Sequence, residues 1–368
     1  MIDSMDASRW TSFERLSQEA RRDWRCIRAA RDRACTTITR LHGDAFFQGM
    51  PPDTAFIVFG SLARREETEK SDIDWTMLVD GQADAQHVQF AHAIGRRLED
   101  MGLCKPNPAG AFGKLSFSHE LVHNVGGEQD TNRNTTQRVL LLLESCAPSD
   151  VKQVRQRVTE QLFKRYLEDD ITYQSEQQEV RVPRFLLNDI VRFWRTMAVD
   201  FPAKQRDRNG KGWALRNFKL RMSRKLIFVS GLLTCMNARA RPHLIKTPDD
   251  NDRRDTRWAL QDYLARVTDT PPLEILADAV LAYGDPHRQD TFDRLVGMFT
   301  AYEEFLAILN DPDRRAFLDS LDRDGARSAP LFTQECRSIG NRFQDGLIAL
   351  FFESNDVLTK TCQRYGVF

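Results

Sequence analysis

The segment from Val58 to Leu78 reads VFGSLARREETEKSDIDWTML and places two acidic residues beside an apolar run. The run AFIVF at 55–59 is continuous and contains β-branched and aromatic residues, which is typical of a buried central strand. The run DIDWTMLV at 72–79 alternates instead, and predicts a second strand. Side chains two residues apart on a strand project from the same face. We therefore expect Asp72 and Asp74 to lie side by side, with the intervening apolar residues facing the core.

Two neighbouring carboxylates repel each other, and burying them without a partner costs free energy. A divalent cation removes this conflict, because hard oxygen ligands suit Mg²⁺. The Gly60–Ser61 turn supplies a second feature, since glycine permits close backbone approach and a following helix aims N–H groups at an anion. Together these features predict a site for a metal-bound triphosphate. The matching chemistry is in-line nucleotidyl transfer, assisted by two metal ions about 3.5–4 Å apart.

The loop between the two strands carries a longer pattern, G-S-x-A-R-x-E-x-T-x-x-S-D-x-D. It is spelled without insertion by Gly60, Ser61, Ala63, Arg64, Glu66, Thr68, Ser71, Asp72 and Asp74. This pattern resembles the signature of the polymerase-β-like nucleotidyltransferase superfamily. It is most similar to bacterial enzymes that uridylylate or adenylylate signalling proteins, with weaker similarity over residues 53 to 146.

The resemblance implies a role for each matched position. Gly60 and Ser61 would bind the triphosphate of an NTP such as ATP, and Asp72 and Asp74 would bind Mg²⁺ or Mn²⁺. Arg64 would contact phosphate or pair with a nearby acid. Glu66 and Thr68 would either take part in the site or cap and hold the loop.

The superfamily usually adds a third carboxylate on a later strand, and the sequence leaves its identity open. Asp130, in GGEQDTNRNTTQR, is the first choice as a catalytic and metal-binding residue, because flanking glycines allow close backbone approach. Glu120 and Glu128 are the rivals. A loop-capping role for Asp130 is the alternative.

A basic cluster, GWALRNFKLRMSRKL at 212–226, marks the second half of the chain. Read as a helix, it carries a stripe of basic residues. Related enzymes close such a helix over the nucleotide, so the resemblance makes Lys219 a candidate nucleotide-binding residue. The competing interpretation is a solvated helix face.

The pattern predicts an α+β fold, with a small mixed-sheet nucleotidyltransferase head followed by an α-helical bundle domain. We expect an N-terminal helical segment at 1–45, the nucleotidyltransferase domain at 46–150 and the α-helical domain at 151–368. Apolar residues at helical spacing predict helices around 184–199, 213–240, 286–310 and 332–364. The same periodicity predicts helices at 84–101 and through 137–145, and KLSFS at 114–118 is a candidate strand.

The composition argues against several classes of protein but does not exclude a local basic groove. Lysine plus arginine and aspartate plus glutamate each number 53, which removes the usual signature of a dedicated nucleic-acid binder. The seven cysteines form no Cys-x-x-Cys pair, and this suits reduced thiols. The N-terminus lacks a signal-peptide pattern, and the apolar runs are too short to span a bilayer. We therefore expect a soluble cytoplasmic protein with no membrane partner.

These features predict a metal-dependent transferase that moves a nucleoside monophosphate from an NTP donor to a hydroxyl acceptor. The acceptor would be a protein side chain, a small molecule or an RNA end. Two alternatives stay open. One is a synthase of an oligonucleotide or cyclic-dinucleotide signal, and the other is a nucleotide-binding regulator without turnover.

Overall fold

The computed structural model describes residues 10–104, 112–168, 180–207, 210–245 and 255–366. Its head is a four-stranded sheet in the order β3-β2-β1-β4. The strands are β1 (Thr54–Val58), β2 (Trp75–Val79), β3 (Lys114–Phe117) and β4 (Cys146–Ser149). β1 is antiparallel to β2 and to β4, whereas β2 is parallel to β3. The sheet is therefore mixed, as the sequence predicted.

Both faces of β1 are buried, which explains its continuous apolar run. Phe56 and Val58 belong to a core inside the head, together with Ile94 of α6 (Ala85–Asp100). Ala55 and Ile57 belong to a larger core that the sheet shares with the helical part of the chain. The sheet thus separates a small core in the head from the main core of the molecule.

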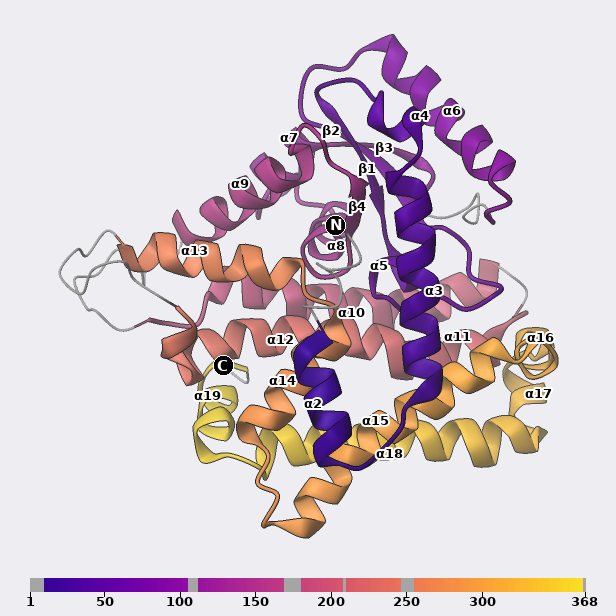
Figure 1. Ribbon diagram of the computed structural model, residues 1–368, viewed down its shortest axis with the longest axis vertical. Helices are drawn as coiled ribbons and strands as arrows, with labels where there is room; N and C mark the ends of the chain where they lie inside the picture. The colour runs from indigo at the N-terminus through magenta and orange to yellow at the C-terminus, as the bar shows by residue number, and fades with distance from the viewer. Residues whose placement is uncertain (1–9, 105–111, 169–179, 208–209, 246–254, 367–368) are drawn as a thin grey trace.

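The other helices of the head connect the strands and lead to β4. They are α5 (Gly60–Ala63), α7 (Ser118–His123) and α8 (Asn132–Leu143). α8 packs against α10 (Arg184–Asp207) and α12 (Lys225–Ala240) of the helical region. The C-terminal end of α8 leads directly into β4, beside β1 (Figure 1). The sequence did not predict β4, because the short segment CAPS carries no alternating pattern.

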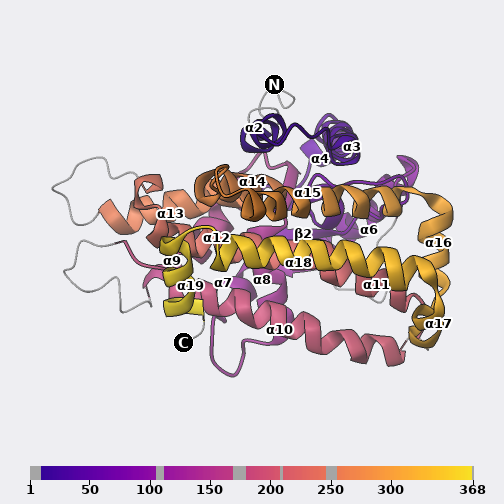
Figure 2. The ribbon, with the colours of Figure 1, turned by 90° about the horizontal axis from the view of Figure 1, so that it is seen from below.

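Beyond β4, the described residues form helices and no strand. They are α9 (Val154–Glu168), α10 (Arg184–Asp207), α11 (Trp213–Lys219), the π-helical segment η3 (Leu220–Arg224), α12 (Lys225–Ala240), the short 3-10 helix η4 (Pro242–Leu244), α13 (Asp255–Thr268), α14 (Pro272–Tyr283), α15 (Gln289–Asn310), α16 (Pro312–Ser320), α17 (Arg323–Ser328), the π-helical segment η5 (Leu331–Cys336), α18 (Arg337–Phe352) and α19 (Asp356–Gly366). Figure 2 shows α18 lying between α15 and α10. This arrangement confirms the predicted α+β class with a helical region after the head.

Carboxylates from the C-terminal helices anchor the N-terminal helices α2 (Thr11–Glu19) and α3 (Arg25–His42). Glu274 of α14 accepts hydrogen bonds from the backbone N–H groups of Ser12 and Phe13, at 2.6 and 2.8 Å. Glu303 of α15 binds the first turn of α3 in the same way. An acidic group at a helix N-terminus satisfies free N–H groups and complements the helix dipole. The N-terminal helices α2 and α3 are therefore packed against α14 and α15, and α4 (Ala45–Gln48) leads from α3 to β1.

The main core contains residues from all three predicted segments, from Trp10 through Ala55 to Leu350. The boundaries near 45 and 150 stay predictions. Among the described residues, no helix combines the length and the apolar character that crossing a membrane requires.

The contact between α15 and α18 predicts opposite effects for two glycine substitutions. A Cβ at Gly346 would lie 2.5 Å from Met298 Cβ and 2.7 Å from the carbonyl oxygen of Arg294, whereas nothing lies within 4 Å of a Cβ at Gly297. We expect Gly346→Ala to lower the free energy of unfolding by about 1–3 kcal/mol through overpacking. Gly297→Ala should raise it by up to about 1 kcal/mol, because alanine favours the helix. Urea unfolding of both variants measures this difference. Equal effects would contradict the close contact between the two helices.

Candidate active site

The two aspartates lie in the extended segment that leads into β2. The strand begins at Trp75, three residues later than the sequence predicted, because the ladder with β1 ends at the pair Val58–Trp75. Before this point, Asp72 forms an isolated parallel bridge with Cys104. Ile73 is 1% exposed, while Asp72 is exposed and Asp74 is partly exposed. The expected alternation between a core face and a carboxylate face is therefore present in the extended segment.

Gly60 brings the start of α5 against the second aspartate. Its φ of +70° is a conformation that side chains rarely adopt, and a Cβ at this position would lie 3.1 Å from Asp74 Oδ2. The Phe59 N–H also donates to the Asp74 carbonyl oxygen at 2.8 Å. The glycine-serine turn and the carboxylate segment are thus in direct contact.

Glu144, which the sequence analysis did not select, holds this turn. The Gly60 N–H donates to Glu144 Oε1 at 2.8 Å, and Arg64 Nη1 donates to Oε2 at 2.7 Å. Arg64 Nε also donates to Glu66 Oε2 at 2.8 Å. Arg64 therefore pairs with acids, the second of its two expected roles, and Glu66 helps to hold the loop. No local pattern marks Glu144, because it reaches the turn only through the pairing of CAPS with β1.

The environment of Asp74 disfavours its charged form. Burial and, after it, the nearby charges of Asp72 and Glu144 together raise the pKa of Asp74 to about 7. The cations Lys219 and Arg64 oppose this rise only in part. A carboxyl group that is destabilised by other carboxylates is a candidate for binding a cation.

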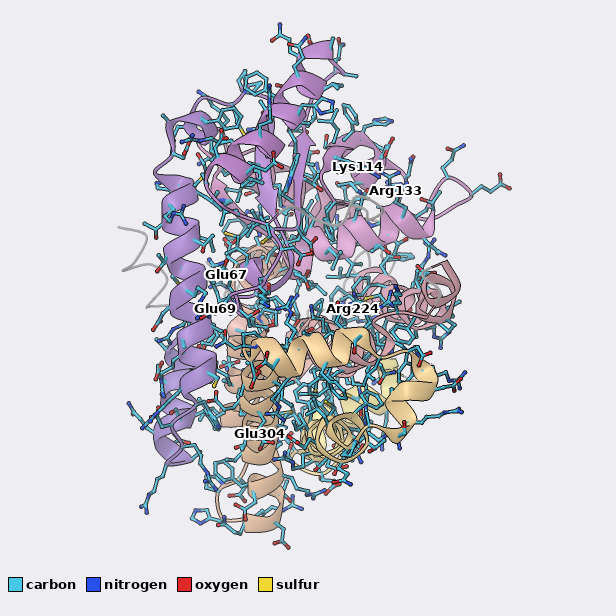
Figure 3. The ribbon with its side chains drawn as sticks, turned by 90° about the vertical axis from the view of Figure 1, so that its right-hand side faces the viewer. Glu67, Glu69, Lys114, Arg133, Arg224 and Glu304 are labelled. Atoms are coloured by element: carbon cyan, nitrogen blue, oxygen red, sulfur yellow. The ribbon has the colours of Figure 1, made fainter. Side chains whose placement is uncertain are left out.

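Lys219 reaches the site from the helical region. It is the last residue of α11 and lies just before the π-helical segment η3. Burial lowers its pKa to about 8, with Arg315 and Arg224 adding to the decrease and Asp72 opposing it. The structure therefore brings Lys219 into electrostatic range of the aspartates. In Figure 3, Arg224 lies on the helical side of the molecule, below Lys114 and Arg133 of the head.

Arg315 of α16 is a second residue that sequence reasoning missed. Its guanidinium donates to Thr68 Oγ1 at 3.0 Å and to the Lys70 carbonyl oxygen at 2.7 Å. The Thr68 N–H donates to Ser71 Oγ at 3.0 Å, so Thr68 and Ser71 close the loop on itself. A helix near the C-terminus thus holds the loop that leads to Asp72. Figure 3 shows two acidic residues of this loop, Glu67 and Glu69, beside α3.

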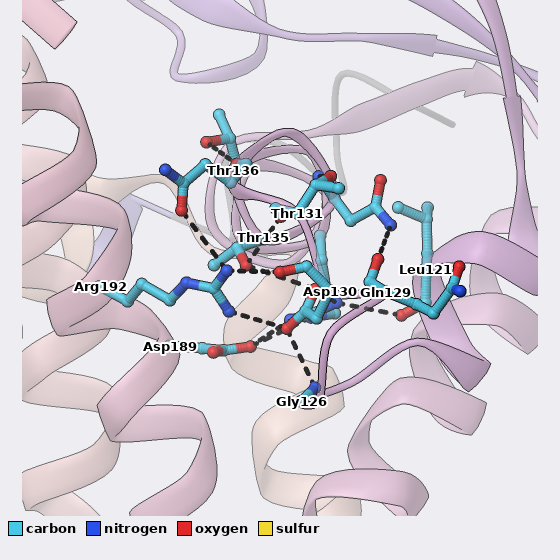
Figure 4. A network of polar contacts seen from close by, with 12 residues as sticks. Leu121, Gly126, Gln129, Asp130, Thr131, Thr135, Thr136, Asp189 and Arg192 are labelled. Atoms are coloured by element: carbon cyan, nitrogen blue, oxygen red, sulfur yellow. Dashed lines mark hydrogen bonds and ion pairs between the residues drawn. The ribbon is translucent and has the colours of Figure 1, made fainter.

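Asp130 occupies a different part of the head. Its Oδ2 accepts hydrogen bonds from the Gly126 N–H at 3.0 Å and from Arg138 and Arg192 at 2.9 Å each (Figure 4). Arg138 also pairs with Asp189 of α10, and its side chain is completely buried. The neighbouring arginines hold the pKa of Asp130 below its usual value, against the opposing effect of burial.

The structure does not bring Asp130 together with Asp72 and Asp74. Asp130 precedes α8 and Glu144 follows it, and a helix of 12 residues is about 18 Å long. Because Glu144 binds Gly60, Asp130 lies at the far end of α8 from the glycine turn. The rival acids are exposed, with Glu120 on the first turn of α7 and Glu128 on the turn before Asp130.

Comparison with known families gives one match. Residues 14–107 match the family described as "Putative nucleotidyltransferase DUF294". The matched range contains Gly60, Asp72 and Asp74, whereas Glu144 and Lys219 lie outside it. Searches of curated proteins and of solved structures find no match for the chain. The family match supports a nucleotidyltransferase assignment in general terms.

Asp74→Asn should stabilise the folded protein at high pH. With the pKa raised from 3.8 to about 7, the folded state binds a proton more tightly than the unfolded state, so wild-type stability falls as pH rises between these values. The asparagine side chain does not ionise, so the variant does not lose stability in this pH range. We expect its free energy of unfolding to exceed that of wild type by about 1–4 kcal/mol at pH 8, with the difference disappearing near pH 4. Urea unfolding in EDTA measures it.

Glu69→Gln is the control for this experiment, because Glu69 is an exposed carboxylate in the same loop. It should change stability by less than about 0.5 kcal/mol. A pH-independent effect of Asp74→Asn would contradict the charge repulsion.

Asp130→Asn should destabilise the protein. The substitution removes a charged partner from the fully buried Arg138, and breaking such a pair costs about 3 kcal/mol. Glu128→Gln, on the exposed turn two residues earlier, should leave stability unchanged. Thermal unfolding of both variants checks this, and equal stability would show that the pair contributes nothing.

Proposed function

We propose that the protein is a Mg²⁺-dependent nucleotidyltransferase that moves an NMP from an NTP to a hydroxyl acceptor. The observation that carries this proposal is the contact between the carboxylate segment and the glycine turn, with Gly60 against Asp74. The family match over residues 14–107 supports the reaction class. The labelling experiment below also identifies the NTP and the acceptor.

Asp72 and Asp74 fit Mg²⁺ as hard oxygen donors whose mutual repulsion a cation would relieve. Within the described residues, no group of three or more histidine, cysteine, aspartate or glutamate side chains is placed to hold a metal ion. This agrees with Mg²⁺ bound by two carboxylates, because Mg²⁺ usually completes its coordination with water and substrate phosphates. When bound, the ion would neutralise charge that develops on the phosphate oxygens.

We assign the residues around the carboxylates either to phosphate binding or to positioning of the turn. The Gly60 N–H already donates to Glu144, so we assign phosphate contact at the turn to the hydroxyl and N–H of Ser61. Lys219 would approach the phosphates from the helical side. Arg64 and Glu144 are bonded to each other and to the turn, and we assign them a positioning role.

The proposed reaction is a substitution at the α-phosphorus of the NTP. The acceptor oxygen forms a bond to this phosphorus, and the bond to the oxygen that bridges to the β-phosphate breaks. Pyrophosphate leaves with that electron pair, and the hydroxyl proton passes to solvent. In this proposal, the positive charges of Lys219 and Arg315 would stabilise the negative charge that the leaving group gains.

Transfer of label tests the proposal. The purified protein is incubated with each α-³²P-labelled NTP and Mg²⁺ or Mn²⁺, first alone and then with cell lysate. Wild type should label a discrete product, and Asp72→Asn/Asp74→Asn should reduce labelling by more than about 1,000-fold, because both carboxylates would be needed to hold the metal.

Glu69→Gln is the matched control, since it also removes a carboxylate of the loop and should keep wild-type activity. Sensitivity to protease, nuclease or neither then identifies a protein, RNA or small-molecule acceptor. A product formed without lysate would indicate a synthase. Labelling that survives the double substitution would refute the assignment, and NTP binding without any product would favour the regulator.

A further inference from the structure

A second group of cations lies away from the aspartates, where the π-helical segment and α12 face α18. It consists of Arg221 and Lys225, which are four residues apart and share a helix face, together with Arg337 at the start of α18. Residues two apart on a helix project in roughly opposite directions. Arg221 therefore faces away from Lys219, which lies near Asp72.

The partners of these cations are neutral. Arg221 Nη2 donates to Asn341 Oδ1 at 2.7 Å, and Lys225 Nζ donates to Gln344 Oε1 at 2.6 Å. Arg337 lies over the ring of Phe332, with 5.9 Å between the guanidinium carbon and the ring centroid. Across the described residues, no carboxylate forms an ion pair with any of the three cations. Within the part of the chain that the structure describes, no ion pair therefore neutralises the charge of the group.

This arrangement differs from that of other arginines in the protein. Arg342, on the same helix α18, donates to Glu304 at 2.8 Å, and Arg28 pairs with Glu14. Acidic partners raise the pKa of both arginines. In the second group the pKa values are lowered instead. Burial, followed by the charge of Arg337, lowers the pKa of Arg221. Burial, followed by the charge of Arg221, lowers the pKa of Lys225 to about 8.

The group presents hydrogen-bond donors. The amide oxygens of Asn341 and Gln344 accept from Arg221 and Lys225, which leaves their NH₂ groups as further donors. Gly340 lets the Arg221 guanidinium lie directly against α18, because a Cβ there would fall 2.9 Å from Arg221 Cζ. A surface of cations and amide donors, held by neutral side chains, matches the acceptor oxygens of a phosphate.

We propose that Arg221, Lys225 and Arg337, with Asn341 and Gln344, form a second binding site that takes the di- or triphosphate group of a small molecule. The size of the group supports a small ligand. Arg337 and Gln344 are seven residues apart, which is about 10 Å along a helix and matches a short phosphate chain. Nucleic acid would need a longer basic track. The site is separate from the proposed active site and does not depend on nucleotidyl transfer.

Calorimetric titration with inorganic tripolyphosphate in EDTA tests the site in the full-length protein. We expect binding to wild type and to Lys219→Gln, and at least about tenfold weaker binding to Arg221→Gln/Lys225→Gln, because two charge-assisted contacts are lost. Glutamine keeps a polar side chain that can contact Asn341 and Gln344. Arg342→Gln is the matched control, because it removes an α18 cation that is already paired with Glu304, and it should bind like wild type.

Hydrogen exchange provides a second measurement that does not depend on variants. Tripolyphosphate should slow exchange of the wild-type amides in 220–225 and 337–344. Unchanged exchange there, binding that is lost in Lys219→Gln alone, or wild-type affinity in Arg221→Gln/Lys225→Gln would each overturn the proposal.

Discussion

The geometry of the candidate active site depends on the two hydrogen bonds that the Glu144 carboxylate accepts. One comes from the Gly60 N–H and the other from Arg64, so a single side chain fixes both the start and the end of α5. Glu144 is 6% exposed, and at this depth a charged hydrogen bond is strong while an unpaired partner is costly. The turn is consequently held in the left-handed conformation that places Gly60 against Asp74.

Helix α8 connects this interaction to the rest of the molecule. Glu144 follows its C-terminal end. Asp130 precedes its N-terminal end and pairs with Arg138, two turns into the helix, and Arg138 also pairs with Asp189 of α10. The Tyr166 hydroxyl of α9 donates to Asp189 at 2.6 Å and accepts from Arg138. A helix is stiff over this length, so its two bonded ends fix the position of the glycine turn relative to the helical region. The network around Asp130 is thus structural, although it lies far from the turn.

Local patterns predicted the parts of the site that are close in sequence. The apolar run of β1, the Gly60–Ser61 turn and the acidic pair lie within 20 residues, so strand periodicity and turn chemistry were enough to place them. Glu144 and Arg315 could not be found in this way. Glu144 depends on the pairing of Val58 with Cys146, and Arg315 reaches the loop across 245 residues of sequence. Both depend on long-range packing that no local pattern encodes.

Asp130 shows the opposite case. Its local pattern predicted a position near the metal site, whereas in the structure it binds Arg138 and Arg192. Its glycine-flanked, polar context resembles a loop that approaches a metal, but the same residues suit a helix N-terminus. Thr131 accepts a hydrogen bond from the Asn134 N–H and caps α8. The deciding partner, Arg138, lies two turns into that helix. The sequence pattern shows that the loop is polar. The role of Asp130 depends on the buried charge of Arg138, which the local pattern does not reveal.

The distribution of charge carries information that the zero net charge conceals. Carboxylates neutralise arginines such as Arg28 and Arg342, yet the helix from Trp213 to Ala240 keeps cations on both sides of its π-helical segment. Lys219 lies toward the aspartates, and Arg221 and Lys225 lie toward α18. Cations without acidic partners raise the local positive potential, which attracts anions regardless of the total charge. A π-helical turn shifts the phase of the helix, and such turns occur frequently at functional sites. This single helix therefore presents positive charge in two directions, toward the proposed NTP site and toward the second group of cations.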